Sequence, residues 1–204
     1  MSIKLQVAKG LGDAYLNCLR AISYVGHETV RPIGFKFDGC ENIINIANNV
    51  QEDTPTVISN VSKGIFKCNG LDFGVKEVQC VCDGVLTLQE LLEGSGIISL
   101  HDCEIIHSTS AINVSVVFAK AAGWYTVEMN TSKLKENGFN NYIAINSRHC
   151  DIETFSYNRV SRLDDVDVYE VNIVTNDSIS EQAVLDNSMK ILSNAEQDFV
   201  KIIS

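Results

Sequence analysis

This sequence of 204 residues has no long apolar run and no excess of basic residues, and we expect no leader segment. The apolar runs are far shorter than a membrane-spanning helix needs, so we expect no contact with a membrane. The first residues alternate between polar and apolar types, which indicates a strand rather than a signal or transit peptide. With 16 basic and 26 acidic residues the formal net charge is -10, which argues against direct binding to nucleic-acid phosphates.

The common catalytic motifs are missing too. The chain has no glycine-rich phosphate loop ending in Gly-Lys-Ser/Thr, no Gly-x-Ser-x-Gly elbow, no His-Glu-x-x-His and no Cys-x-x-Cys. Its seven cysteines are odd in number and scattered, which predicts reduced thiols rather than a disulfide framework. We therefore expect no catalytic residue, no cofactor and no metal ion in this chain.

One alternative to this view is a metal site. Cys80 and Cys82 alternate along a predicted strand, so their side chains point to the same face. Together with His101, Cys103 and His107 further along the chain, they would supply the metal ligands. Their spacing matches no structural zinc pattern, and buried cysteine is common in protein cores.

Two further patterns have both a chemical and an ordinary interpretation. His149 and Cys150 suggest a nucleophile with its base, but neighbouring residues of a strand point to opposite faces. The acidic residues 164, 165 and 167 would suit Mg²⁺, although a solvated turn before a strand explains them more simply. An ordinary structural role is favoured for both.

Residues 11–25 form the most informative stretch. Stepped at about 100° per residue, they place apolar side chains on one broad arc and polar side chains on a narrow opposite stripe. The arc consists of Leu11, Tyr15, Leu16, Cys18, Leu19 and Ile22, and the polar stripe of Asp13, Asn17, Arg20 and Tyr24. Gly26 supplies a residue that can adopt the left-handed conformation that ends many helices. The pattern predicts a helix with two working sides.

The remaining pattern predicts an α+β fold with an antiparallel sheet and two long helices. A second amphipathic helix, over residues 180–203, carries Leu192 and Phe199 on its apolar face. Alternating apolar and polar residues predict four strands, at residues 2–7, 31–38, 152–158 and 166–173. Because the last two strands should pair with those near the N-terminus, this domain is discontinuous and combines residues 1–48 and 146–204.

Residues 49–145 predict a second, β-rich domain inserted into the first. It opens with a short helix that starts at Thr54 as N-cap and ends near Lys63. Short strands separated by glycines follow, at residues 65–68, 75–81, 103–107, 111–119 and 142–145. Such close spacing is typical of a compact antiparallel domain.

Several motifs, in their order and spacing, resemble those of the bacterial-type RNA polymerase alpha subunit over nearly the whole chain. Residues 10–20, Gly-Leu-Gly-Asp-Ala-Tyr-Leu-Asn-Cys-Leu-Arg, resemble the signature Gly-x-Gly…Leu-Gly-Asn-Ala-Leu-Arg-Arg that opens the family's first helix. Residues 50–53 are similar to its Val-x-Glu-Asp, and residues 103–107 to its Val-Glu-Ile-Val strand. Residues 175–180 look like its Thr-Asp/Asn-Gly-Ser/Thr-Ile turn before the last helix.

The resemblance implies an assembly subunit of a nucleotidyltransferase, with no active site in this chain. In the family, the first and last helices of two alpha chains form a homodimer on which the large beta and beta-prime subunits assemble. The implied dimer interface contains Leu11, Tyr15, Leu19, Ile22, Leu192 and Phe199. The implied interface with a large subunit contains Asn17, Arg20, Glu52 and Asp53. DNA would be contacted only through the complete enzyme.

Departures from the family pattern predict a minimal, divergent alpha subunit. Leu16 replaces the glycine before the helix asparagine, and Ala21 replaces the second arginine of the Arg-Arg pair. We expect no separate C-terminal DNA-binding domain after the last helix. Divergence without a transit peptide favours a polymerase encoded and assembled in a plastid or chloroplast, with the bacterial cytoplasm or a large virus as alternatives.

Two other classes of protein remain open. One is the heterodimeric assembly subunit of archaeal or eukaryotic polymerases, although the long insert and residues 50–53 favour the bacterial type. The other is an unrelated interaction domain or an enzyme whose site is built from residues outside any motif. Turnover by the purified chain, or a tightly bound stoichiometric metal, would favour the enzyme.

Overall fold

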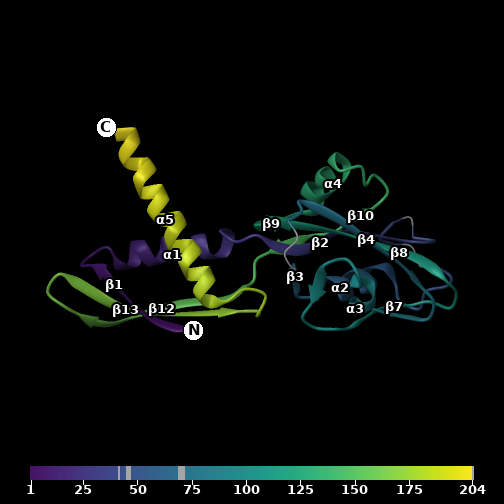
Figure 1. The fold of residues 1–204 in the computed structure, drawn as a ribbon, viewed down its shortest axis with the longest axis horizontal. Helices are drawn as coiled ribbons and strands as arrows, with labels where there is room; N and C mark the ends of the chain where they lie inside the picture. Colours follow the sequence, from purple (N-terminus) through teal and green to yellow (C-terminus); the bar gives the residue numbers. More distant parts are fainter. Residues whose placement is uncertain (41, 45–46, 69–71, 204) are drawn as a thin grey trace. The chain divides into compact units, whose positions relative to one another are not determined.

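The computed structural model describes residues 1–40, 42–44, 47–68 and 72–203, with side chains described as far as residue 195 in the last helix. The chain forms two compact units, one from Met1–Glu28 with Cys150–Ser204 and one from Thr29–His149. Both contain helices and antiparallel strand pairs (Figure 1). The expected α+β class with mostly antiparallel sheets is confirmed.

The first unit is a three-stranded sheet with two helices over one face (Figure 1). The strands lie in the order β1 (Ser2–Ala8), β13 (Val166–Thr175) and β12 (Ile152–Arg162). The helices are α1 (Gly12–Val25) and α5 (Glu181–Ile203). The pairing of β1 with β13 confirms that the N-terminal strand joins the strands that follow residue 150.

Strand alternation explains the core of this unit. Tyr169 and Val171 point to the helix side of β13 and are buried together with Leu16 of α1. The approach of helix to sheet is close at Gly12, where a Cβ atom would clash with the ring and hydroxyl of Tyr169. Glycine is therefore required at the start of α1.

The second unit is built on a six-stranded sheet in the order β4, β8, β2, β3, β6, with β10 as a further partner of β2. The sheet strands are β2 (Thr29–Phe37), β3 (Phe66–Cys68), β4 (Val75–Cys82), β6 (Ile97–Ser99), β8 (Ile112–Ala121) and β10 (Ile143–Ala144). Two smaller pairs join β5 (Val85–Thr87) to β7 (Glu104–His107) and β9 (Gly123–Tyr125) to β11 (Ser147–His149). The helices are α2 (Thr54–Ser62), α3 (Leu88–Leu92) and α4 (Val127–Glu136).

Helices of the second unit cover both faces of its central strands over much of their length. On one face Phe118 of β8 packs with residues of α2 and α3 and makes an edge contact with Phe66, at 5.1 Å between ring centroids. On the other face Val117 packs with Leu134 of α4. Gly34 admits α4 closely, because a Cβ atom there would lie 2.8 Å from Leu134.

The compact units divide the chain at different positions from those expected for the domains. Strand β2 pairs with β8 from Thr29 opposite Ala121 to Phe37 opposite Val114, so it belongs to the second unit rather than to a domain of residues 1–48. Residues 146–149 also lie in the second unit, where β11 pairs with β9. The alternation of β2 reveals a strand but contains no information on its partner.

Candidate assembly surfaces

Helix α1 presents different side chains to the core and to solvent. Its buried side consists of Gly12, Leu16, Leu19 and Ser23, which recur every three or four residues. Leu19 has no exposed surface at all. This corrects the expectation that Leu19 lies at a dimer interface, because a fully buried side chain has no area left to bury against a second chain.

The remaining apolar side of α1 is open. Leu11 and Val25 are 59% and 58% exposed, Cys18 is exposed, and Tyr15 and Ile22 are half-buried. These five residues, which we call the open stripe, are separated alternately by four and three positions. This is the a/d spacing with which helices pack against other helices. Cys18 and Val25 were absent from the predicted interface, although the same spacing includes them.

An apolar hollow of about 500 Å³ borders the open stripe. It is lined by Gln6, Val7 and Ala8 of β1, by Leu11, Ala14, Tyr15 and Cys18 of α1, and by Leu192 of α5. Leu192 of α5 thereby lines the same hollow as Leu11 and Tyr15 of α1. An apolar concavity of this kind offers a partner side chain a place to be buried.

Helix α5 is anchored to the first unit through its first half. Val184 and Leu185 belong to the core, and Leu192 is half-buried. Residues 193–195 are exposed, and the helix continues to Ile203 (Figure 1). Phe199 was predicted to lie at the dimer interface, and its side chain is outside the described ones.

A polar seam joins the two helices. The Oγ atoms of Ser23 on α1 and Ser188 on α5 are 2.9 Å apart, and both residues are buried. His27 Nε2 lies 3.5 Å from the Ser188 hydroxyl. Burial lowers the pKa of His27, and the opposing influence of Asp151 is smaller. Uncharged His27 is therefore the form that suits this seam near neutral pH.

Gly26 ends α1 in a different way from the one expected. Its φ is -88°, so the helix ends without a left-handed residue, and the Gly26 N–H donates to the Ile22 carbonyl at 2.7 Å. A Cβ atom at this position would lie 2.7 Å from that oxygen and 2.9 Å from Ile191 of α5. Glycine is needed here for close contact between the helices rather than for its backbone freedom.

The polar stripe of α1 holds the two residues expected to face a large subunit. The side-chain Oδ1 of Asn17 accepts a hydrogen bond from the Tyr157 hydroxyl at 3.1 Å. Arg20 is exposed, and within the described residues no hydrogen bond or ion pair to its guanidinium is present, including none from Asp13. Arg20 is therefore accessible to a partner, whereas Asn17 already positions β12 against α1.

Glu52 and Asp53 belong to the second unit, and both have structural partners. The backbone N–H of His107 donates to Glu52 Oε2 at 2.8 Å. The ring Nδ1 of His107 pairs with the other carboxylate oxygen, Oε1. Burial alone would raise the pKa of Glu52, but these hydrogen bonds outweigh it and lower the pKa. The same contact raises the pKa of His107. Asp53 rather than Thr54 caps α2, since Thr56 N–H donates to its carboxylate at 2.9 Å.

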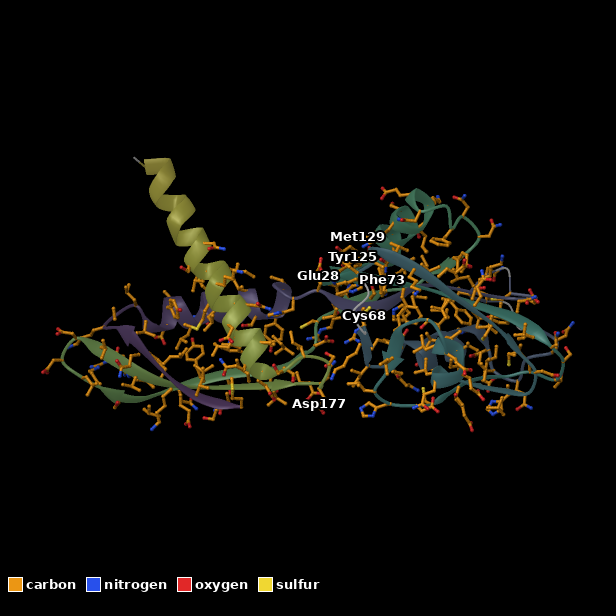
Figure 2. The ribbon with its side chains drawn as sticks, viewed as in Figure 1. Glu28, Cys68, Phe73, Tyr125, Met129 and Asp177 are labelled. Atoms are coloured by element: carbon orange, nitrogen blue, oxygen red, sulfur yellow. The ribbon has the colours of Figure 1, made fainter. Side chains whose placement is uncertain are left out.

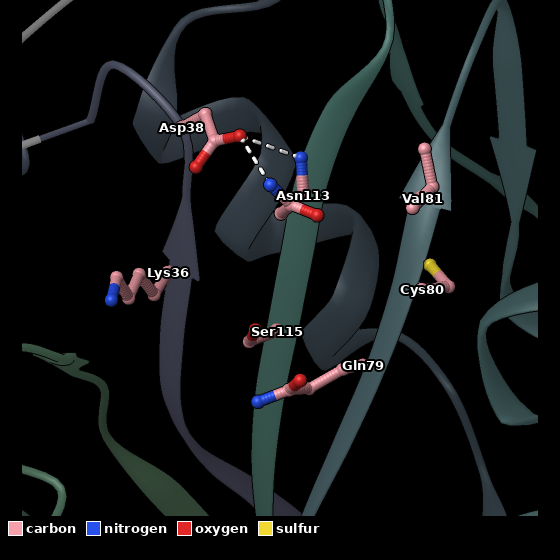
Figure 3. Close-up of a pocket in the computed structure, with 7 residues that line it drawn as sticks. All are labelled: Lys36, Asp38, Gln79, Cys80, Val81, Asn113 and Ser115. Carbon is pink, nitrogen blue, oxygen red and sulfur yellow. Dashed lines mark hydrogen bonds between the residues drawn. The ribbon is translucent and has the colours of Figure 1, made fainter.

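An open polar hollow of about 470 Å³ lies on the sheet of the second unit. Figure 3 shows side chains that line it. Lys36, Ser115 and Gln79 form one row across three adjacent strands. Asp38 accepts hydrogen bonds from the backbone and side-chain nitrogens of Asn113 at 2.9 and 2.8 Å. Burial raises the pKa of Cys80 to about 11, so its thiol stays protonated at neutral pH. This hollow thus offers a polar surface without an activated nucleophile among its described lining residues.

The structure also locates the residues behind the alternative chemical interpretations. Within the described residues, no group of three or more His, Cys, Asp or Glu side chains is placed to hold a metal ion. His149 is completely buried, with Nδ1 2.8 Å from the Thr29 carbonyl and Nε2 3.0 Å from Ser147 Oγ. Because Ser147 is buried as well, a substrate has no access to this serine–histidine pair.

The acidic run contains one residue that is not solvated. Asp167 is only 3% exposed and pairs with Arg162 Nε at 3.4 Å and Arg159 Nη1 at 3.8 Å. A solvated turn therefore does not describe Asp167, whose charge is balanced across β12 and β13. Among the described helices, none is both long and apolar enough to cross a membrane.

Comparison with known proteins agrees with the family resemblance of the motifs. No protein-family model matches the chain. The chain is similar to DNA-directed RNA polymerase subunit alpha from two strains of Staphylococcus epidermidis, at 23% identity over 201 residues in each case. The match covers 95% of this chain but 63% of each relative, so the chain spans less than two thirds of their length. Similarity along almost the whole chain supports a distant, alpha-subunit-like relationship to these polymerase proteins.

Proposed function

We propose that this chain is a non-catalytic, alpha-like subunit of a multisubunit DNA-directed RNA polymerase. Two copies would form a homodimer through α1 and α5, and the dimer would be the platform for beta-like and beta-prime-like subunits. The similarity to alpha subunits supports the polymerase role. The open stripe carries the proposal of a dimer, because it is an apolar surface on a helix whose other side is already buried.

The physical argument for a second copy rests on self-complementarity. In a twofold dimer the same surface is used by both chains, and a/d spacing lets one open stripe interdigitate with another. Burying a large apolar side chain contributes roughly 1.5–3 kcal/mol, so a few residues of the stripe suffice to hold two chains together. The apolar hollow beside the stripe would receive side chains of the partner's helices.

Sedimentation of a charge variant tests this proposal directly. The double variant Leu11→Glu, Cys18→Glu places two carboxylates on the open stripe without touching the core. We expect wild-type protein to sediment as a dimer and this variant as a folded monomer with unchanged far-ultraviolet circular dichroism. The matched control is Val174→Glu, a 43% exposed position on the other face of β13, which should remain dimeric. A dimer unaffected by the double variant would refute the proposal.

The last helix supplies a second test. The sequence places Phe199 on the apolar face of α5, so Phe199→Asp should give monomers or insoluble chains. Met189→Asp is a matched substitution on the same helix at a 37% exposed position. If Phe199→Asp left the dimer intact, α5 beyond residue 195 would have no part in association.

The proposed partners determine the composition of the complete assembly. Purification from the native source should recover one beta-like and one beta-prime-like chain for every two copies of this chain. A second, different chain in place of the second copy would instead favour the heterodimeric, archaeal or eukaryotic type. Asn17, Arg20, Glu52 and Asp53 remain the proposed contacts with a large subunit, and the plastid remains a prediction from sequence.

A further inference from the structure

The ribbon formed by β9 and β11 has two unlike sides. Tyr125 lies opposite Ser147, and its ring packs edge-on against His149 at 5.3 Å between centroids. These residues form the inner side of the ribbon. Trp124 lies opposite Arg148, so alternation directs both side chains to the other side. Trp124 is 63% exposed, and Arg148 is exposed as well.

The apolar surface continues from the ribbon into the first turn of α4. Val127 and Met129 follow Trp124 within five positions and are 39% and 49% exposed. Met129 and the neighbouring Tyr125 are labelled in Figure 2. Trp124 is the only tryptophan of the chain. Tryptophan, methionine and arginine are enriched in protein interfaces, and tryptophan and arginine often carry most of the binding energy.

The charge around this surface is opposite to that of the whole chain. Residues 120–149 contain four cations and two anions, which are Lys120, Lys133, Lys135 and Arg148 against Glu128 and Glu136. Lys120 is paired with Asp72 at 3.0 Å, so the other three cations and the two anions leave a local charge of +1 in a chain of -10. Arg31 Nε donates to the Arg148 carbonyl at 3.1 Å and brings a second guanidinium near the ribbon.

Glu128, the acidic residue in the first turn of α4, has a partner other than Arg148. A hydrogen bond with Thr126 lowers the pKa of Glu128 and holds its carboxylate at the N-terminus of α4. Within the described residues, Arg148 has no ion-pair partner. The Arg148 guanidinium, opposite the exposed Trp124 indole, is therefore available to pair with an anionic group from outside the unit.

We propose that Trp124, Val127, Met129 and Arg148 form a docking surface for an acidic, amphipathic protein segment. Its apolar side chains would cover the indole and Met129, and its carboxylates would pair with Arg148. The proposal goes beyond dimerisation and uses no residue of α1 or α5. Bases of a single-stranded nucleic acid also stack on tryptophan, but firm binding of that kind needs several phosphate contacts, and the chain carries an overall charge of -10.

The test uses the full chain and peptides of defined composition. The probe is a fluorescein-labelled peptide of about 16 residues with leucine on one helical face and glutamate on the other. The comparators are the same peptide with lysine for glutamate, and an oligothymidylate of equal length. Because Trp124 is the only tryptophan, a change in intrinsic emission reports binding at this surface. We expect the acidic peptide alone to bind, with an affinity that falls as salt is raised.

Variants then identify the binding residues by fluorescence anisotropy of the labelled peptide. Trp124→Ala and Arg148→Glu should each weaken binding about tenfold or more. Ile98→Ala and Lys67→Glu are the matched controls, since this cross-strand pair offers an apolar residue and a cation on another part of the same unit. The controls should bind as wild type does. Equal binding of the lysine peptide, tighter binding of the oligothymidylate, no binding of the acidic peptide, or full binding by Trp124→Ala would each overturn the proposal.

Discussion

The two compact units bury their apolar side chains in different ways. In the second unit, Val117 and Phe118 are neighbours on β8 and are completely buried on opposite faces, each beneath helices of the same unit. In the first unit, α1 and α5 cover one face of the sheet, yet Leu11 and Val25 still expose more than half of their surface. One side of a helix can thus be buried in the core of its own chain while apolar residues on another side stay exposed.

This difference separates folding from association. Substitutions in the core of the second unit should lower the free energy of unfolding and leave the oligomeric state alone. Substitutions at the exposed Leu11 and Cys18 of the open stripe should do the reverse, because these side chains contribute little to the core of their own chain.

The largest expected effect is on folding of the second unit. Phe118→Ala removes a completely buried ring that contacts Phe66, and such changes cost about 3–5 kcal/mol of the free energy of unfolding. Urea denaturation would measure the loss. Val81→Ala, at a 65% exposed position of the same sheet, should stay within about 0.5 kcal/mol of wild type. At urea concentrations below the unfolding transition, the Phe118→Ala variant should still sediment as a dimer. Dissociation of the dimer under these conditions would contradict the separation of folding from association.

A smaller effect, confined to assembly, is expected at Arg20. Its guanidinium is exposed and suited to bidentate contact with a partner carboxylate, so Arg20→Ala should cost about 2 kcal/mol or more in binding a beta-like subunit. Unfolding should change by no more than about 0.5 kcal/mol. Co-purification of the large subunit gives the measurement, with exposed Lys4→Ala as the control. Normal recovery of the complete polymerase with Arg20→Ala would contradict the assignment.

A modest pH dependence should come from the Glu52–His107 pair of the second unit. The pKa of Glu52 is lowered from its ordinary value of 4.5, so its stabilisation is complete above that value and is lost as the pH falls through the folded pKa. The pKa of His107 is raised from 6.5, so its stabilisation is complete below 6.5 and is lost as the pH rises through the folded pKa. The pair should therefore contribute fully between pH 4.5 and 6.5.

Urea midpoints measured across pH give the test of this pair. Glu52→Gln should lower the midpoint most within that window and flatten its pH dependence. Glu93→Gln removes an exposed carboxylate from the same unit and is the matched control. An identical pH profile for wild type and Glu52→Gln would show that the pair contributes nothing to stability.

The smallest effect is expected with DNA. A formal charge of -10 repels phosphates, so the pure chain should not retard duplex promoter DNA at physiological salt. Electrophoretic mobility is the measurement, and a clear shift would contradict the prediction. The second unit is the place to look for any such binding, since residues 120–149 have a formal net charge of +2 by sequence.

Local pattern predicted the elements well where apolar residues are periodic. The strands expected at 75–81 and 111–119 are β4 and β8, and the helix expected from 54 to 63 is α2. Helix α4 was missed because only Asn130 and Leu134 of its ten residues are buried, which leaves no apolar period to detect. The partner of β2 was missed because pairing between residues 77 to 92 positions apart depends on the whole fold.

At the candidate surfaces, too, local pattern predicted some features and missed those that depend on the whole fold. A helical projection of residues 11–25 identified the apolar arc, and the structure splits that arc into a buried side with Leu19 and an open stripe with Leu11. The projection alone does not say where the neighbouring sheet ends. Gly26 shows a similar limit, because its role depends on Ile191, which is distant in sequence. Exposure of Trp124 is likewise a property of the ribbon pairing rather than of its sequence neighbours.

The polar seam between α1 and α5 has a consequence for the shape of the proposed platform. Ser23 and Ser188 meet in one alignment of the two helices, and sliding either helix by a turn would separate the hydroxyls in a buried setting. Apolar residues at both positions would tolerate several alignments. The hydrogen bond between the two serines therefore favours one position of Leu192 relative to Leu11. It thereby also determines the shape of the surface against which a second chain would pack.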